Sequence, residues 1–246
     1  MRPEPFVAAS SALARHHPDC LGAFVAGSVM RGEGTATSDI DIVVLYGDDF
    51  EDVHRASLMH EGWPIEFFVQ HVEAQRYFFE KDRQRGMCVL ADMVATGTML
   101  PESTKLLEQQ KNEARQIIEA GPPPLTPEDT DRRRYAITNL IDDVVGSTNI
   151  PVTNAVLAEL HDALADFYLR THGRWSGHGK SVLRSLRDAD EPLYDRFVHA
   201  FDRGFATDVD PIRKLVDELL APEGGRLWEG YAERAHPGWL TDPLNA

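Results

Sequence analysis

The chain contains only two cysteines among its 246 residues, Cys20 and Cys88, and neither has a metal-binding spacing. Two thiols beside apolar residues are typical of buried, reduced cysteines rather than of a disulfide framework. No apolar run approaches the roughly 20 residues of a membrane-spanning helix. The N-terminus also lacks the basic and then apolar pattern of a secretory signal. These absences predict a cytoplasmic protein that does not associate with membranes.

Basic residues are also scarce: the sequence contains 25 Lys and Arg but 40 Asp and Glu, which gives a net charge of −15. The excess is even: residues 1–121 hold 19 acids and 11 bases (−8), and residues 122–246 hold 21 acids and 14 bases (−7). A protein that binds nucleic acid needs a basic track for the phosphates, and the sequence shows none. An acidic surface favours cationic partners, although it also serves solubility alone. We therefore expect no nucleic-acid partner.

Two aspartates stand at the centre of the most informative stretch, residues 27–44. Gly27-Ser28 follows a short apolar run, and Asp39 and Asp41 lie one residue apart at the start of a second apolar run. In a strand, side chains at i and i+2 share a face, so the two carboxylates project together while the neighbouring isoleucines point into the core. The carboxylates repel one another unless a cation lies between them, and hard oxygen ligands suit Mg²⁺.

The Gly27-Ser28 pair has a separate role. Glycine lets the backbone approach a ligand closely, and a turn that leads into a helical N-terminus offers free N–H groups to phosphate oxygens. We accordingly expect Gly27-Ser28 to begin a brief helical segment that carries Arg31. A phosphate-binding turn beside a carboxylate pair is typical of sites for metal-assisted phosphoryl or nucleotidyl transfer.

Gly27-Ser28, ten further residues and then Asp39-Ile40-Asp41-Ile42 resemble the signature of the DNA polymerase β-like nucleotidyltransferase superfamily. Arg31-Gly32 and Ser38 agree with the same pattern. The resemblance implies that Asp39 and Asp41 hold one or two Mg²⁺ ions. It also implies that the phosphates of a nucleoside triphosphate, ATP in this reading, contact Gly27, Ser28, Arg31 and Ser38.

Glu66 is an acid within the apolar residues 63–69, which we predict to be a strand. A carboxylate in such a strand costs several kcal/mol unless it has a partner. The superfamily carries a third acid on a neighbouring strand, and the resemblance places Glu66 there as a catalytic residue. Its role is either a third metal ligand or the general base for the acceptor hydroxyl. Asp39 and Asp41 with the triphosphate already satisfy one octahedral ion, which favours the base. An outward position on an edge strand is the remaining alternative.

The remaining segments predict an α/β N-terminal domain with a small mixed sheet over residues 1–121. The expected strands cover residues 21–26, 40–46 and 63–69, and residues 52–59 are too mixed to assign. Residues 93–101 resemble the last edge strand of the superfamily's domains. The expected helices cover residues 5–17, 71–95 with a break near Gly86, and 103–120 with Ser103 as the cap. Three consecutive prolines at 122–124 mark the boundary. Amphipathic repeats then predict an all-α bundle over residues 127–246.

A glycine-rich loop at residues 172–179 interrupts the helical half and leads into Lys180. A lysine after Gly-x-Gly at a helix start is well placed to meet phosphate oxygens. A solvated lysine on a flexible turn is the alternative. The loop resembles one in the C-terminal domains of aminoglycoside-type nucleotidyltransferases that closes over the nucleotide. That resemblance implies a triphosphate contact for Lys180.

The fused helical half favours the aminoglycoside-type branch of the superfamily. That branch implies transfer of AMP from ATP to a hydroxyl of a small, cationic, antibiotic-like acceptor, and hence a role in antibiotic resistance. Two alternatives stay open: an antitoxin-type enzyme that modifies a protein partner, and a nucleotide-binding relative without catalysis. Antitoxin-type domains are usually shorter and lack a bundle. The acids Asp39, Asp41 and Glu66 argue against a loss of catalysis.

Overall fold

The computed structural model describes residues 2–234. The chain divides into two compact units, Met1–Pro123 and Pro124–Ala246, and each unit has a hydrophobic core of its own. The end of the predicted helical domain, residues 235–246, lies outside the described residues.

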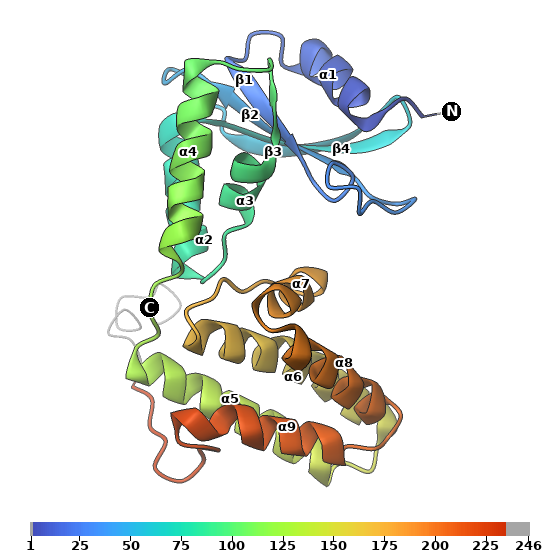
Figure 1. Ribbon diagram of the computed structural model, residues 1–246, viewed down its shortest axis with the longest axis vertical. Helices are drawn as coiled ribbons and strands as arrows, with labels where there is room; N and C mark the ends of the chain where they lie inside the picture. The colour runs from blue at the N-terminus through green and yellow to red at the C-terminus, as the bar shows by residue number, and fades with distance from the viewer. Residues whose placement is uncertain (1, 235–246) are drawn as a thin grey trace, which may run out of the picture. The chain divides into compact units, whose positions relative to one another are not determined.

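A five-stranded mixed sheet forms the centre of the N-terminal unit, in the order β3-β4-β2-β1-β5 (Figure 1). The β2–β4 pair is parallel, and the other neighbouring pairs are antiparallel. The strands are β1 (Gly22–Ala26), β2 (Ile40–Tyr46), β3 (His54–His60), β4 (Trp63–His71) and β5 (Thr98–Leu100). This sheet confirms the prediction of an α/β domain with a small mixed sheet.

Helices cover both faces of the sheet (Figure 1). α1 (Pro5–His16) lies on one face, where the fully buried Ala8, Ala9 and Ala12 let it sit close to Ile42. The other face packs against α2 (Val72–Gln84), α3 (Val89–Thr96) and α4 (Lys105–Ala120) through a cluster that includes Val43. Because side chains alternate along a strand, Asp41 lies on the same face as Val43.

Several local assignments differ from the sequence predictions. β3 forms where the pattern was too mixed to assign, because it is an edge strand that pairs with β4 alone and buries little of its surface. Thr104 rather than Ser103 caps α4, since its Oγ1 accepts the Leu107 N–H at 3.2 Å. β4 lies between β3 and β2, so Glu66 does not stand on an edge strand.

In the described part of the second unit, all regular secondary structure is helical. Its helices are α5 (Pro127–Gly146), α6 (Ile150–Thr171), α7 (Lys180–Ala189), α8 (Glu191–Phe205) and α9 (Asp210–Leu220), followed by the 3-10 turn Ala221–Glu223. One apolar cluster joins these five helices, with Leu164, Phe167 and Phe197 fully buried at its centre. The cluster confirms the predicted helical domain. Within residues 2–234, none of the helices combines the length and apolar character required to span a membrane.

Candidate functional site

The structure brings the three predicted acids together. Asp41 and Glu66 stand directly opposite one another on the parallel strands β2 and β4, and Asp39 immediately precedes β2. Ligand oxygens of Asp39, Asp41 and Glu66 all lie within 4.8 Å of one another. Asp39 is exposed and the other two are half-buried, so the cluster is open to solvent on one side. Among the described residues, this is the one group of three or more acids, histidines or cysteines with such spacing.

Asp41 is partly buried and is repelled by the negative charges of the other two acids. Burial raises the pKa of its carboxyl to about 6, with further contributions from the negative charges of Asp39 and Glu66. The backbone of Gly27 reinforces the crowding, because a Cβ at that position would lie 2.8 Å from Asp41 Oδ2. Gly27 also has a φ of +97°, a conformation that side chains of L-residues rarely adopt. Close approach to Asp41 therefore explains the glycine.

Glu66 has a partner that the sequence did not reveal. Arg55 of β3 donates from Nε to Glu66 Oε1 at 2.6 Å and from Nη2 to Oε2, and Ser57 Oγ donates to Oε1 at 3.2 Å. These hydrogen bonds with Glu66 raise the pKa of Arg55. Glu66 is thus held on both oxygens by a cation, which accounts for a carboxylate within an apolar strand.

Sequence reasoning missed Arg55 and Ser57 because the polar–apolar alternation of β3 covers only Arg55–Leu58, which is too short to assign a strand. Strand pairing supplies the signal instead: the β3–β4 hairpin sets Ser57 opposite Glu66 and Arg55 opposite Phe68. If the register of the β3–β4 hairpin were known, both residues would be identified, because residues opposite one another in a strand pair lie on the same face of the sheet.

The predicted phosphate-binding residues lie in the connection between β1 and β2. Ser28 Oγ donates to Ser38 Oγ at 3.2 Å, and the Thr35 N–H donates to Ser38 Oγ at 2.9 Å. Residues 28–32 form a hydrogen-bonded turn, so the expected brief helix is wrong. The Glu33 N–H donates to the Ser28 carbonyl at 2.9 Å and the Gly32 N–H to the Val29 carbonyl at 3.1 Å, so these bonds span five and three residues rather than the four of an α-helix.

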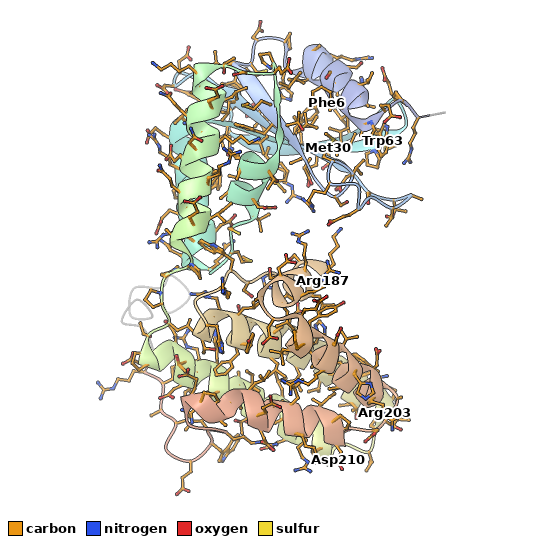
Figure 2. All side chains as sticks on the ribbon, in the orientation of Figure 1. Phe6, Met30, Trp63, Arg187, Arg203 and Asp210 are labelled. Atoms are coloured by element: carbon orange, nitrogen blue, oxygen red, sulfur yellow. The ribbon has the colours of Figure 1, made fainter. Side chains whose placement is uncertain are left out.

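Two further contacts fix this connection. Met30, like Phe6 and Trp63, packs against the apolar cluster on the α1 side of the sheet, and Figure 2 labels all three. Arg31 Nε donates to Glu33 Oε2 at 3.2 Å and is about one-third exposed. The positive charge of Arg31 acts on Asp41 by lowering its pKa, although burial outweighs this effect. Arg31 thus lies near enough to the acids to contribute to their electrostatics.

The donor set fits Mg²⁺. The acids supply only oxygen ligands, these oxygens lie within 4.8 Å of one another, and the charges of Asp39 and Glu66 add to burial in raising the pKa of Asp41. A hard divalent cation with oxygen preference removes that repulsion. Asp39, Asp41 and Glu66 are the residues that would hold it.

Lys180 is the exposed first residue of α7 in the helical unit. The loop before it is fixed by Asp162 of α6, whose Oδ2 accepts the Gly179 N–H at 3.0 Å. Ser181 Oγ accepts the His178 N–H at 2.9 Å and donates to the His178 carbonyl at 2.8 Å. This loop therefore has a defined conformation within its own unit.

Comparisons with known proteins agree with this geometry. Residues 10–117 match the family model of the nucleotidyltransferase domain. That range contains the acids, the β1–β2 connection and Arg55, whereas Lys180 lies outside it. Residues 10–117 are therefore similar to a nucleotidyltransferase domain, and such a domain supports nucleotidyl transfer in general.

Two individual proteins are similar to parts of the chain. A 60-residue segment is 43% identical to the transcriptional repressor NrdR of Chloroflexus aggregans, covering 24% of this chain and 33% of that protein. The chain thus spans about a third of the length of this curated relative. The crystal structure of a nucleotidyltransferase-like protein from Exiguobacterium sibiricum superimposes with a TM-score of 0.41 at 12% identity. That alignment covers 90% of this chain and 81% of the other.

Gly27→Ala is expected to lower the transfer rate by about 10²-fold, because displacing a reacting group by about 1 Å has that effect. The new methyl group would meet Asp41 Oδ2 and push the carboxylate away from its partners. Pyrophosphate release at saturating substrate measures the effect. Gly32→Ala is the matched control, since Gly32 also has a positive φ, +76°, but has open space at its Cβ position. Equal losses in both variants would show that backbone strain, not contact with Asp41, is responsible.

Proposed function

We propose that this protein transfers AMP from ATP to a hydroxyl group of a small acceptor, with Mg²⁺ held by Asp39, Asp41 and Glu66. One observation carries the proposal: the three carboxylates converge beside the Gly27 turn inside the matched nucleotidyltransferase domain. Phosphate-binding and metal-binding groups are then adjacent, as attack at phosphorus requires.

In the proposed reaction, the acceptor oxygen forms a bond to the α-phosphorus while the bond from that phosphorus to the bridging oxygen of the β-phosphate breaks. Pyrophosphate leaves, and the acceptor proton passes to a base. Bound Mg²⁺ neutralises negative charge on the phosphate oxygens. Gly27, Ser28, Arg31 and Ser38 bind and orient the phosphates, which sets the reacting oxygen and the phosphorus in line.

The acceptor proposed here is a small molecule, and a cationic group in it would be attracted by the net charge of −15. An antibiotic substrate, and with it a role in resistance, follows the resemblance to aminoglycoside-type enzymes. Pyrophosphate release from Mg²⁺–ATP, measured across a panel of hydroxylated compounds that includes aminoglycosides, tests the activity. Release that depends on both acceptor and Asp39 supports it. If no compound stimulates release above that of Asp39→Asn, the proposal fails.

Lys180 is proposed to contact the triphosphate from the helical unit. Lys180→Ala is expected to raise the KM for ATP by about 10-fold or more, since a hydrogen bond to a charged group contributes about 1.5–3 kcal/mol. Stability without nucleotide should hardly change, because the side chain is exposed. Lys214→Ala, an exposed lysine on α9, is the control. An unchanged KM in Lys180→Ala would leave Lys180 as a solvated surface residue.

A further inference from the structure

A cavity of about 370 Å³ within the N-terminal unit has Arg55, the partner of Glu66, in its wall. Arg55 and Phe68 form the wall nearest the acids, and helices α2 and α3 complete the cavity through Phe78, Val89, Leu90 and Met93. We propose that this cavity binds an apolar ring of the acceptor, so that the substrate is a hydroxylated molecule with an alicyclic or aromatic part. The proposal rests on the function proposed above.

Arg55 connects the cavity to the reaction site. Its guanidinium lies over the Phe68 ring, 4.8 Å from the ring centroid, and donates to both oxygens of Glu66. One residue thus forms part of the cavity wall and holds an acid of the proposed metal site. Arg55 pairs with Phe68 and Ser57 with Glu66, so Phe68 lies two residues beyond Glu66 on the same face of β4. A group against Phe68 would therefore lie about 7 Å along the strand from Glu66.

The sheet order places this cavity on the acceptor side. Gly27-Ser28 follows β1, and β1 and β4 flank β2 on opposite sides. Phosphates bound at Gly27-Ser28 therefore lie on one side of Asp41, and Arg55 with the cavity lies on the other. In-line transfer requires the attacking oxygen and the leaving pyrophosphate to stand on opposite sides of the phosphorus. The acceptor accordingly approaches from the side of β4 and β3.

The lining defines the chemistry of the occupant. Phe78 and Val89 remain 40% and 47% exposed, although both are large apolar residues at the cavity. The polar residues of the lining are already engaged: Asp82 Oδ2 accepts the Leu90 N–H at 3.1 Å, and Gln70 Nε2 donates to Gln75 Oε1 at 3.3 Å. Small-molecule sites commonly have volumes of about 300–1,000 Å³ and mostly apolar walls. An uncharged ring fits this lining, whereas the ammonium groups of a polycation would remain in solvent.

Methionine methyl NMR on the full-length protein tests the site directly. Met93 lines this cavity, while Met59 lines a separate groove beside Asp39 and Glu66, so one spectrum reports on both places. The probes are cyclohexanol and, as a polar ring of the same size, myo-inositol. We expect cyclohexanol to shift the Met93 signal saturably and to leave Met59 unchanged, and myo-inositol to shift neither. An unmoved Met93 signal, or a Met93 shift caused by Mg²⁺–ATP alone, would overturn the proposal.

Val89→Asp provides the matching functional test. Val89 is the first residue of α3, where an acidic side chain is compatible with the helix dipole, so the variant should fold. It should abolish the cyclohexanol shift and raise the KM for a ring-containing acceptor by about 10-fold, since apolar pocket contacts contribute roughly 1–3 kcal/mol. The KM for ATP should not change. Val7→Asp, at an exposed valine in the first turn of α1 on the opposite face, is the control.

The two proposals fail in different ways. If pyrophosphate release needs Asp39 but cyclohexanol leaves Met93 unmoved, the cavity inference is wrong and the proposed function stands. The same holds if polyols without apolar rings are the better acceptors. If the cavity binds cyclohexanol but no acceptor stimulates pyrophosphate release, the proposed function is wrong and its acceptor site is withdrawn with it.

Discussion

Asp41→Asn is expected to abolish nucleotidyl transfer and, without Mg²⁺, to stabilise the protein. Loss of a metal ligand should lower the rate by at least about 10³-fold, since the metal contributes several kcal/mol of charge stabilisation. Stability should change in the opposite direction. Burial and the neighbouring acids raise the pKa of Asp41 to about 6, so its charge opposes folding at neutral pH.

The pH dependence of this stability follows from the direction of the shift. The folded-state pKa of about 6 exceeds the ordinary value of 3.8, so the folded protein binds the proton more tightly than the unfolded chain. The contribution of Asp41 to the stability of the metal-free protein therefore falls as pH rises from about 4 to 6 and is constant above that range. The difference corresponds to about 3 kcal/mol as an upper value. Asp41→Asn should be the more stable protein above pH 6 and equal to the parent below pH 4.

Chemical denaturation in EDTA at pH 4 and pH 8 measures both limits. At pH 8, Mg²⁺ should make the parent protein more stable than Asp41→Asn, because an ion that binds only the folded state stabilises that state. Asp48→Asn, at an exposed acid just after β2, is the control and should change neither rate nor stability appreciably. Asp39→Asn should lose activity as well. Substantial pyrophosphate release by either Asp39→Asn or Asp41→Asn would contradict the metal site.

The sequence was sufficient to predict that Asp39, Asp41 and Glu66 lie together, but not which residues surround them. Asp39 and Asp41 are detectable because period-two alternation in a strand fixes which side chains share a face. Glu66 is detectable because a lone carboxylate interrupts an apolar strand. Arg55 is different, since its role depends on the register of a hairpin with β3, whose polar–apolar alternation is too short to assign a strand from sequence.

Features that arise from packing could not be predicted from the sequence either. The cavity beside Arg55 exists because α2 and α3 are separate helices, and the break between them is at Gly86, which has a φ of +73°. Sequence periodicity located that break but gave no information on the space it leaves against β4. The helical unit was more predictable, since its apolar repeats are long and each helix buries one face in a single cluster.

Glu66→Gln is the second variant for which we expect a large effect, and it distinguishes a metal ligand from a general base. As a ligand, Glu66 would bind the ion directly, so Glu66→Gln would raise the Mg²⁺ concentration for half-maximal rate and regain much of the rate at high Mg²⁺. As a base, the same change would lower the rate by about 10²–10⁴-fold at any Mg²⁺ concentration and flatten the acidic limb of the pH–rate profile.

Arg55 alters the balance between these roles. The sequence favoured the base, but a guanidinium that engages both oxygens of Glu66 competes with an acceptor hydroxyl for the same lone pairs. A cluster in which ligand atoms lie within 4.8 Å of one another is also compact enough for one ion to replace the guanidinium. We therefore expect Glu66 to exchange Arg55 for Mg²⁺ and to act as a ligand.

Arg55→Gln distinguishes the two roles by whether the Mg²⁺ concentration for half-maximal rate changes. If Arg55 competes with the ion, Arg55→Gln should lower the Mg²⁺ concentration for half-maximal rate by up to about 5-fold, because an exposed ion pair contributes about 1 kcal/mol at most. If Glu66 is the base, Mg²⁺ dependence should be unchanged and the acidic limb should move. Arg83→Gln, which breaks an exposed ion pair with Glu80 elsewhere on α2, is the control. A Glu66→Gln enzyme with its full rate at low Mg²⁺ would exclude both roles and leave Glu66 as a structural partner of Arg55.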